Sequence, residues 1–243
     1  MNILITNDDG IFSEGLLALA NVLSKNNNVY IYAPDSNRSG ASHSASFHKD
    51  FTAVKVDFYG YYAYKLSGTP VDCVRFGLHY APCKIDLVCA GINHGANLGG
   101  DVIYSGTVNA CIEANMSNIP AIAFSNTAFD NFKFDQTVKI IEKYFDKFLN
   151  LTCNDYTLNV NIPNVNVNEI KGVKICDVGN NRYADRYVKS DENTYRLIGE
   201  MLKPDSADQT DVYYSINNFI TVTPIVHIST DNNLINKYKD YKF

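Results

Sequence analysis

The chain has 243 residues, 46% of them hydrophobic, which is enough to bury the core of one large α/β domain. Its net charge of −5, from 26 acidic and 21 basic residues, argues against nucleic acid or a membrane surface as a partner. The sequence shows no signal peptide and no apolar run near the ~20 residues of a membrane helix. Its six cysteines are scattered and form no Cys-x-x-Cys pair, so we expect a cytoplasmic protein.

The chain begins with a strand, a helix and a second strand. The apolar run Ile3–Thr6 predicts a strand buried on both faces. Ser13 is suited to cap a helix that runs to about Ser24. Val29–Ala33 predicts the next strand, which ends at Pro34, and the polar stretch "PDSNRSGASHSASFHKD" predicts a long loop.

The middle of the chain repeats this alternation of strands and helices. In order, we predict a hairpin of Phe51–Phe58 and Tyr61–Leu66, a helix from Thr69-Pro70, a strand at Ile85–Cys89, a helix at Val108–Met116, a strand at Ala121–Ser125, a helix at Phe132–Leu149 and a strand at Leu158–Ile162. Thr107 is expected to cap the helix that starts at Val108. Such alternation predicts a mostly parallel, doubly wound sheet flanked by helices.

The last third is different in character. After a strand at Val173–Val178, the tyrosine-rich and highly charged segment from about Asn181 to Pro204 has strand-like alternation but little apolar density. A segment that buries so little of itself is typical of a flexible loop or of an arm that packs on another subunit. The chain then returns to a strand at Phe219–Thr223 and a terminal helix near Asn232–Tyr238. We therefore expect one domain over residues 1–243, with a core of 1–178, an arm of about 181–204 and a return of 205–243.

Polar loops follow the predicted strands at one edge of the sheet, where ligands bind in such folds. They are Asn7–Gly10, Asp35–Ser42 and Gly91–Thr107. In the first, "NDDG" suits either a tight turn or a cation held between Asp8 and Asp9, because adjacent carboxylates repel each other.

Oxygen donors gather at the same edge. Besides the two aspartates there are Ser39, Asn93 and Asn97, and such a set suits Mg²⁺, Mn²⁺ or Ca²⁺ better than zinc or copper. Each of these three residues is also typical of an ordinary polar loop. A single histidine, His94, is more often a solvated loop residue, although His94 and Arg38 are candidates for additional positive charge.

Ser105-Gly106-Thr107 leads into a helix. The start of a helix presents free N–H groups to an anion, so these three residues are candidates for binding a phosphate group, although the same pattern is typical of a plain helix cap.

The blocks "ILITNDDG", "APDSNRSGASHS", "GTPVDCV", "DLVCAGINHGANLGGDVIYSGTVNA", "IPAIAFS", "LNVNIP" and "ITVTPI" resemble the SurE family, in family order from Met1 to about Ile225. The resemblance implies a Rossmann-like fold with an extended hairpin arm exchanged within a homodimer or homotetramer. It implies a metal-dependent nucleotidase that hydrolyses nucleoside 5′- and 3′-monophosphates, and in some members short polyphosphate.

The resemblance also implies site residues and a cofactor. The family's metal ligands fall on Asp8, Asp9, Ser39 and Asn93, with one Mg²⁺ or Mn²⁺ per subunit and the two aspartates as catalytic residues. Its substrate-binding loop falls on Asn97, Ser105, Gly106 and Thr107. The acidic stretch "SADQTDVYY" is a loose version of a family block and touches none of these proposed ligands.

Two other classes share an acidic site after the first strand. A receiver-like signalling module also holds Mg²⁺ there, but it needs an aspartate after the third strand, where this chain has Asn93, and a lysine after the fifth. A phosphatase that forms a phospho-aspartate typically has Asp-x-Asp rather than adjacent aspartates.

Overall fold

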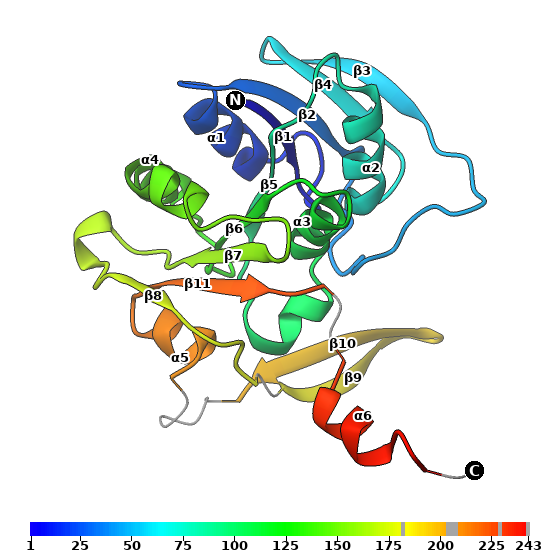
Figure 1. The fold of residues 1–243 in the computed structure, drawn as a ribbon, viewed down its shortest axis with the longest axis vertical. Coiled ribbons are helices and arrows are strands. Elements are labelled where there is room, and N and C mark those ends of the chain that lie inside the picture. Colours follow the sequence, from blue (N-terminus) through cyan, green and yellow to red (C-terminus); the bar gives the residue numbers. More distant parts are fainter. Residues whose placement is uncertain (181–182, 203–208, 228–229, 242–243) are drawn as a thin grey trace.

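The structure is a computed structural model that describes the chain except for residues 181–182, 203–208, 228–229 and 242–243 (Figure 1). The helices are α1 (Glu14–Leu23), α2 (Pro70–Tyr80), α3 (Gly106–Met116), α4 (Phe134–Leu149), α5 (Asp211–Ile216) and α6 (Asn232–Tyr238), with short 3₁₀ turns η1 (Gly99–Ile103) and η2 (Val167–Glu169). The strands are β1 (Asn2–Thr6), β2 (Asn28–Pro34), β3 (Ala53–Phe58), β4 (Tyr61–Leu66), β5 (Leu87–His94), β6 (Ala121–Asn126), β7 (Thr157–Ile162), β8 (Val173–Ile175), β9 (Tyr183–Asp191), β10 (Thr194–Met201) and β11 (Ile220–Ile225).

One mostly parallel sheet organises the described residues. Its nine strands lie in the order β3-β4-β2-β1-β5-β6-β7-β11-β8, and only the pairs β3–β4 and β7–β11 are antiparallel. The strand order reverses at β1, which lies between β2 and β5. This reversal places the carboxyl ends of β1 and β5 side by side, where the fold is expected to bind its ligand.

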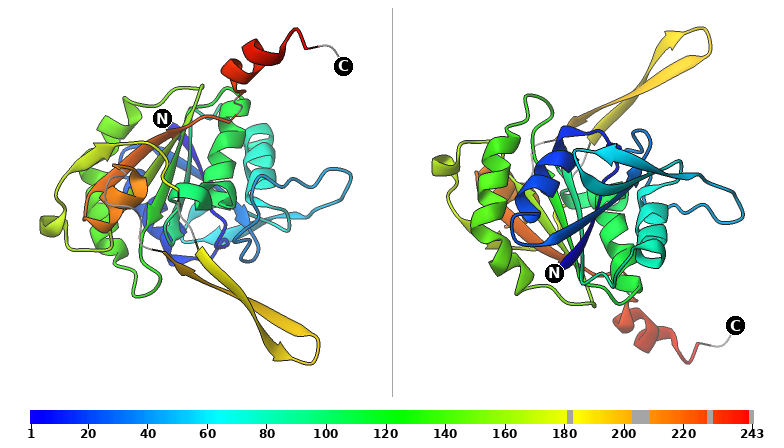
Figure 2. Two further views of the ribbon diagram at one scale, coloured as in Figure 1. Left: turned by 90° about the horizontal axis from the view of Figure 1, so that it is seen from below. Right: turned by 90° about the horizontal axis from the view of Figure 1, so that it is seen from above.

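Helices cover both faces of the sheet (Figures 1 and 2). Alternation along β1 explains why: Ile3 and Ile5 join the cluster that includes α1 and α4, whereas Leu4 joins the cluster with α2 and α3. Both sets of side chains are fully buried, so the strand is apolar throughout, as the sequence predicted. The α/β sheet flanked by helices is confirmed.

Four elements differ from the sequence predictions, and one of them, β8, ends at Ile175 rather than at Val178. Ser105, not Thr107, caps α3, because its Oγ accepts the hydrogen bond from the Val108 amide at 3.0 Å. Strand β5 extends to His94, past an irregularity in its pairing between Ala90 and Asn93, so Asn93 belongs to the strand. Helix α5 was not predicted, since six residues are too few to show a helical period.

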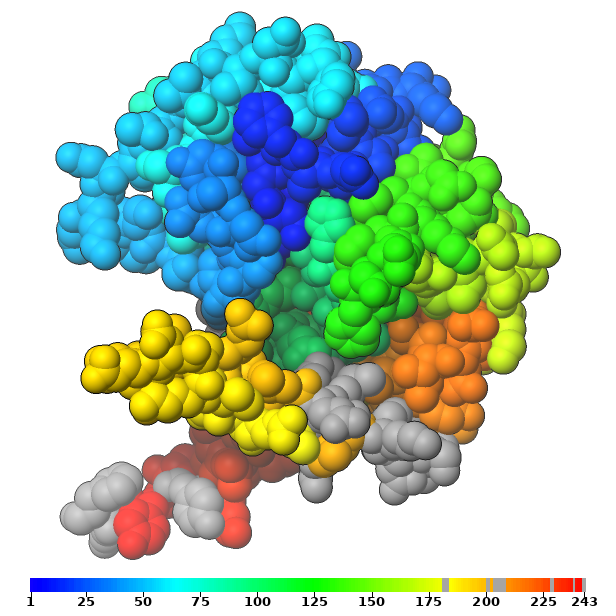
Figure 3. Space-filling model, turned by 180° about the vertical axis from the view of Figure 1, so that it is seen from behind, coloured from blue at the N-terminus to red at the C-terminus, as the bar shows by residue number. Residues whose placement is uncertain are grey.

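The predicted arm is an antiparallel hairpin of β9 and β10 that projects from the body of the protein (Figures 2 and 3). The ends of the predicted arm, at residues 181–182 and 203–204, lie outside the described residues. No helix in the described ranges is both long and apolar enough to cross a lipid bilayer.

Candidate active site

The turn after β1 is built by Asn7 and Gly10. The Asn7 side-chain amide donates to the Gly10 carbonyl at 3.0 Å and to Ser13 Oγ at 2.7 Å, and its Oδ1 accepts from the Gly10 amide at 3.3 Å. Gly10 has a φ of +106°, which favours glycine. The carboxylates of Asp8 and Asp9 make their described hydrogen bonds elsewhere, so the turn does not account for them.

Asp8 is fixed to the start of α3. Its Oδ1 accepts a hydrogen bond from Thr107 Oγ1 at 2.7 Å and its Oδ2 accepts one from the Gly106 amide at 3.1 Å. Asp8 and the backbone of Gly106 lie so close together that a Cβ on Gly106 would be 2.8 Å from the Asp8 Cβ. Burial raises the pKa of Asp8, as does the nearby Asp9 charge, although the Thr107 hydroxyl acts in the opposite direction.

Asp9 pairs with His94. Its Oδ2 accepts from the His94 amide at 3.2 Å and lies 2.7 Å from His94 Nδ1. The imidazole packs edge-on against the rings of Phe132 and Phe134, at centroid distances of 4.7 and 5.0 Å. The hydrogen bond to Asp9 raises the pKa of His94, against the lowering effect of burial. The interpretation of His94 as a solvated loop residue is therefore wrong, because the side chain is partly buried and paired.

The loop after β2 reaches the site through its backbone. The Arg38 amide donates to the Asp8 carbonyl at 2.6 Å, and Ser39 follows directly. Ser39 is exposed, and its amide donates to Asn37 Oδ1 at 2.7 Å. The Arg38 guanidinium binds Asp35 of this loop and the Ser67 carbonyl that follows β4, at 3.1 and 2.9 Å.

The two asparagines of the loop after β5 have different environments. Asn93 lies at the end of the strand opposite Ser125, with its side-chain amide 2.9 Å from the Gly95 carbonyl. Asn97 is buried, and its amide donates to Asn161 Oδ1 at 2.8 Å while its carbonyl accepts from the side chains of Asn159 and Asn161. Its own side-chain amide donates to Ser125 Oγ at 2.8 Å. Asn97 is thus held rigidly by its backbone.

The structure joins some candidates directly and others only through neighbours. Hydrogen bonds connect Asp8 with Gly106 and Thr107, and Asp9 with His94. Ser105 turns its hydroxyl inward as the helix cap. Two of the donors that the sequence suggested for a phosphate group, the Gly106 amide and the Thr107 hydroxyl, are thus used on Asp8.

The donor set suits a hard divalent cation. Among the described residues no cluster of three or more His, Cys, Asp and Glu side chains gathers at one point. A cation at this edge would therefore rely on the two carboxylates and on neutral oxygens such as those of Ser39 and Asn93, a chemistry that Mg²⁺ and Mn²⁺ accept. Burial raises the pKa of Asp8, so a cation beside this carboxylate would favour the charged form that burial disfavours. The residues fit such an ion.

Sequence reasoning missed several residues that shape the site. Asp211 of α5 accepts a hydrogen bond from Gly99 in the loop after β5, and Phe132 and Phe134 enclose His94. Asn159 and Asn161 could have been noticed, because two asparagines on the same face of a buried strand require polar partners.

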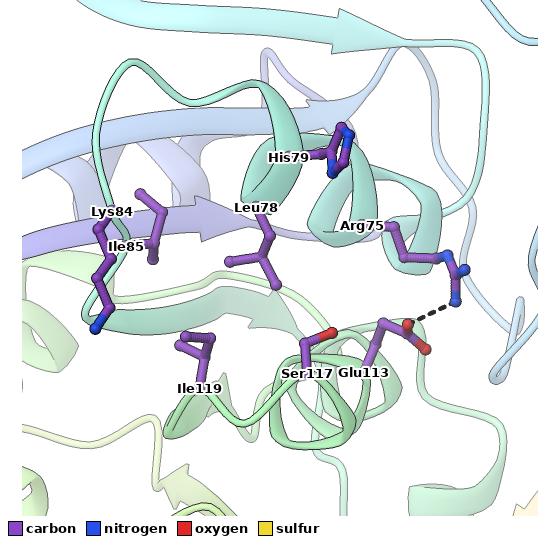
Figure 4. Close-up of a pocket in the computed structure, with 8 residues that line it drawn as sticks. All are labelled: Arg75, Leu78, His79, Lys84, Ile85, Glu113, Ser117 and Ile119. Carbon is purple, nitrogen blue, oxygen red and sulfur yellow. Dashed lines mark hydrogen bonds and ion pairs between the residues drawn. The ribbon is translucent and has the colours of Figure 1, made fainter.

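A separate cavity of about 360 Å³ opens between α2 and α3 (Figure 4). An ion pair of Arg75 Nη1 with the buried Glu113, at 2.8 Å, forms one side, and Lys84 lies at the other end. No candidate site residue lines this cavity, so it is distinct from the carboxylate pair.

Comparison with known proteins gives a consistent result. The family model described as survival protein SurE matches residues 3–185. The chain is 42% identical to the 5′-nucleotidase SurE of Clostridium botulinum (strain 657 / Type Ba4), covering 97% of this chain and 96% of the relative. It is 36% identical to the 5′-nucleotidase SurE of Petrotoga mobilis, covering 99% of each. The crystal structure of the SurE protein from Aquifex aeolicus superposes with a TM-score of 0.85 at 35% identity and 98% coverage of both chains. The chain belongs to the SurE family.

Proposed function

We propose that this protein is a metal-dependent phosphomonoesterase that converts nucleoside 5′-monophosphates, and also 3′-monophosphates, to nucleoside and phosphate. Short polyphosphate is proposed as a further substrate. The relatives carry the name 5′-nucleotidase, and this supports the substrate class. The single observation in this chain that supports the chemistry best is the buried carboxylate of Asp8, adjacent to Asp9 and bound to the start of a helix at the carboxyl edge of the sheet.

Asp8, Asp9, Ser39 and Asn93 would hold one Mg²⁺ or Mn²⁺ per subunit. When bound, such an ion polarises a phosphoryl oxygen and lowers the pKa of a bound water.

The chain's own residues prepare the site for a phosphate group. Thr107 and Gly106 fix the orientation of Asp8, and His94 fixes that of Asp9. The start of α3 contributes a partial positive charge near the position of an anion. Asn97 and Ser105 are the proposed substrate contacts: Asn97 is held by the bond of its amide to Asn161, and Ser105 by the bond of its hydroxyl to the Val108 amide.

The test is release of inorganic phosphate from a panel of nucleoside 5′- and 3′-monophosphates and short polyphosphate, with Mg²⁺, Mn²⁺ or excess chelator. We expect turnover of the monophosphates with metal and none in chelator. Full turnover in chelator, with no metal retained on the protein by elemental analysis, would show that the reaction does not need the cation. No phosphate release from any nucleotide under any condition would overturn the proposed function.

We also propose a homodimer or homotetramer that exchanges the β9–β10 hairpin within a single-domain subunit. The hairpin exposes Tyr187, Tyr195 and Leu197 to 74%, 60% and 52%, an apolar surface that a neighbouring subunit would cover. Analytical ultracentrifugation should give an oligomer at micromolar concentration, and a variant with the hairpin replaced by a short linker should give monomers or aggregates. A monomeric intact protein would refute the exchange.

A further inference from the structure

Asp211 is a buried carboxylate that binds three backbone amides at once. Its Oδ2 accepts from Gly99 at 2.9 Å, and its Oδ1 accepts from Gly179 and from Val212, each at 2.7 Å. The residue is 0% exposed, at the first position of α5. The three hydrogen bonds offset part of the cost of removing this carboxylate from water.

The two distant partners of Asp211 come from segments with different roles. Gly99 lies two residues after Asn97, in the segment that leads through η1 to Ser105. Gly179 lies four residues before the start of β9, and we call it the base of the hairpin for its position in the sequence. Both segments approach Asp211 closely: the Gly99 amide lies 2.9 Å from its Oδ2, and a Cβ on Gly179 would lie 2.7 Å from Thr210 Oγ1 and 3.0 Å from Asp211 Oδ1. The Asp211 carboxylate therefore holds the loop of residues 95–105 and the base of the hairpin to each other.

We propose that Asp211 is a positioning residue for the phosphomonoesterase reaction, which holds the loop of residues 95–105 in register with the base of the β9–β10 hairpin. It thereby couples the seating of the hairpin to the binding of substrate by Asn97. This inference rests on the proposed function for its effect on catalysis, but the anchoring of the loop can be measured without any substrate.

Asp211→Asn distinguishes the hydrogen bond to Gly99 from the hydrogen bonds to Gly179 and Val212. An asparagine has one acceptor oxygen, and it retains the most hydrogen bonds when that oxygen faces Gly179 and Val212. Its NH₂ group then faces the Gly99 amide, donor against donor, so Asp211→Asn releases the loop but keeps the hairpin base. Gly179→Ala makes the complementary change, because its Cβ displaces the hairpin base from the same carboxylate.

Two controls separate positioning from loss of stability. Asp155→Asn changes an exposed aspartate before β7, at the opposite edge of the sheet. Ile141→Val lowers the stability of the core at α4, by removing a methylene from a fully buried side chain that is remote from the loop.

The experiment compares these variants by hydrogen exchange of peptides covering residues 95–105 and by steady-state kinetics with a nucleoside monophosphate. We expect Asp211→Asn to speed exchange in the loop by about tenfold or more. We expect it to raise KM by about fivefold or more while kcat changes by less than about threefold. Gly179→Ala should shift both quantities in the same direction, and the two controls should shift neither.

The outcomes are distinguishable. If Asp211→Asn leaves loop exchange and KM at wild-type values, or if Ile141→Val raises KM as much, Asp211 has only a structural role and the inference is overturned. If Asp211→Asn does not fold, an unchanged loop in Gly179→Ala overturns the coupling. If the wild-type protein releases no phosphate, the proposed function fails, whereas faster loop exchange in Asp211→Asn still supports the anchoring.

Discussion

Replacement of Asp8 by asparagine should greatly lower the activity without unfolding the protein. In the structure the carboxylate accepts two hydrogen bonds, from the Gly106 amide and from the Thr107 hydroxyl. An asparagine can keep both contacts, because its oxygen can accept from Gly106 while its NH₂ group donates to the hydroxyl oxygen of Thr107. The change therefore removes a charge and very little else.

We expect a small effect on stability and a large effect on activity. The raised pKa of Asp8 means that the folded protein disfavours its charged form, so the free energy of unfolding of Asp8→Asn without metal should be within about 1 kcal/mol of wild type or above it. Turnover should fall at least ~100-fold, which corresponds to ~2.7 kcal/mol of barrier. At a concentration of 100 times its Kd, a metal ion should stabilise the wild type by about 2.7 kcal/mol and the variant by much less.

The assay combines phosphate release with chemical denaturation in chelator and in Mn²⁺ or Mg²⁺, and Asp155→Asn provides the matched control for the loss of one negative charge. Wild-type turnover in Asp8→Asn would show that this carboxylate is not needed for the reaction. A loss of several kcal/mol of stability in chelator would show instead that its main role is to hold α3 in place.

Three further outcomes are expected. Ser39→Ala and Asn93→Ala should weaken metal binding and activity less than the aspartate changes do, since neutral oxygens attract a cation less strongly; a metal titration in which either variant is the more damaged would reverse this ranking. Thr107→Val should lower activity through the reorientation of Asp8, and Thr107→Ser should restore it; equal kinetics in all three proteins would leave the hydroxyl without a role in the reaction. Burial raises the pKa of Asp211 above its value in the unfolded chain, so the wild type should gain stability relative to Asp211→Asn as the pH falls through that raised pKa toward about 4. It should lose this gain as the pH rises. A difference in the free energy of unfolding between the two proteins that stays constant across this pH range would contradict the prediction.

Local sequence patterns predicted most of the fold because each pattern is read from neighbouring residues. The cap at Ser13 and the apolar run of β1 are of this kind. The choice between Ser105 and Thr107 as the cap of α3 could not be made locally, because both residue types suit the position. Contact with Asp8, about a hundred residues earlier, assigns Thr107 to the carboxylate and leaves Ser105 as the cap.

The candidate site was predicted in its position but not in its internal contacts. The rule for parallel sheets placed Asp8, Asp9 and Asn93 at one edge, and they do lie at the ends of β1 and β5. The pairing of His94 depends on Phe132 and Phe134, which reach it from the start of α4, and the anchoring of Gly99 depends on Asp211. These contacts join residues that are far apart in the sequence, and no sequence pattern predicts them.

The hydrogen bond between Gly99 and Asp211 spans 112 positions of the chain, and this order matters during synthesis. The candidate site residues lie between Asp8 and Thr107, so all of them are synthesised long before α5. A chain that ends after β7, from a damaged message or a stalled ribosome, thus carries all of the candidate site residues and the asparagines that hold Asn97, but it lacks the carboxylate that binds Gly99. Such a chain therefore differs from a finished one in the contacts of Gly99 as well as in its length.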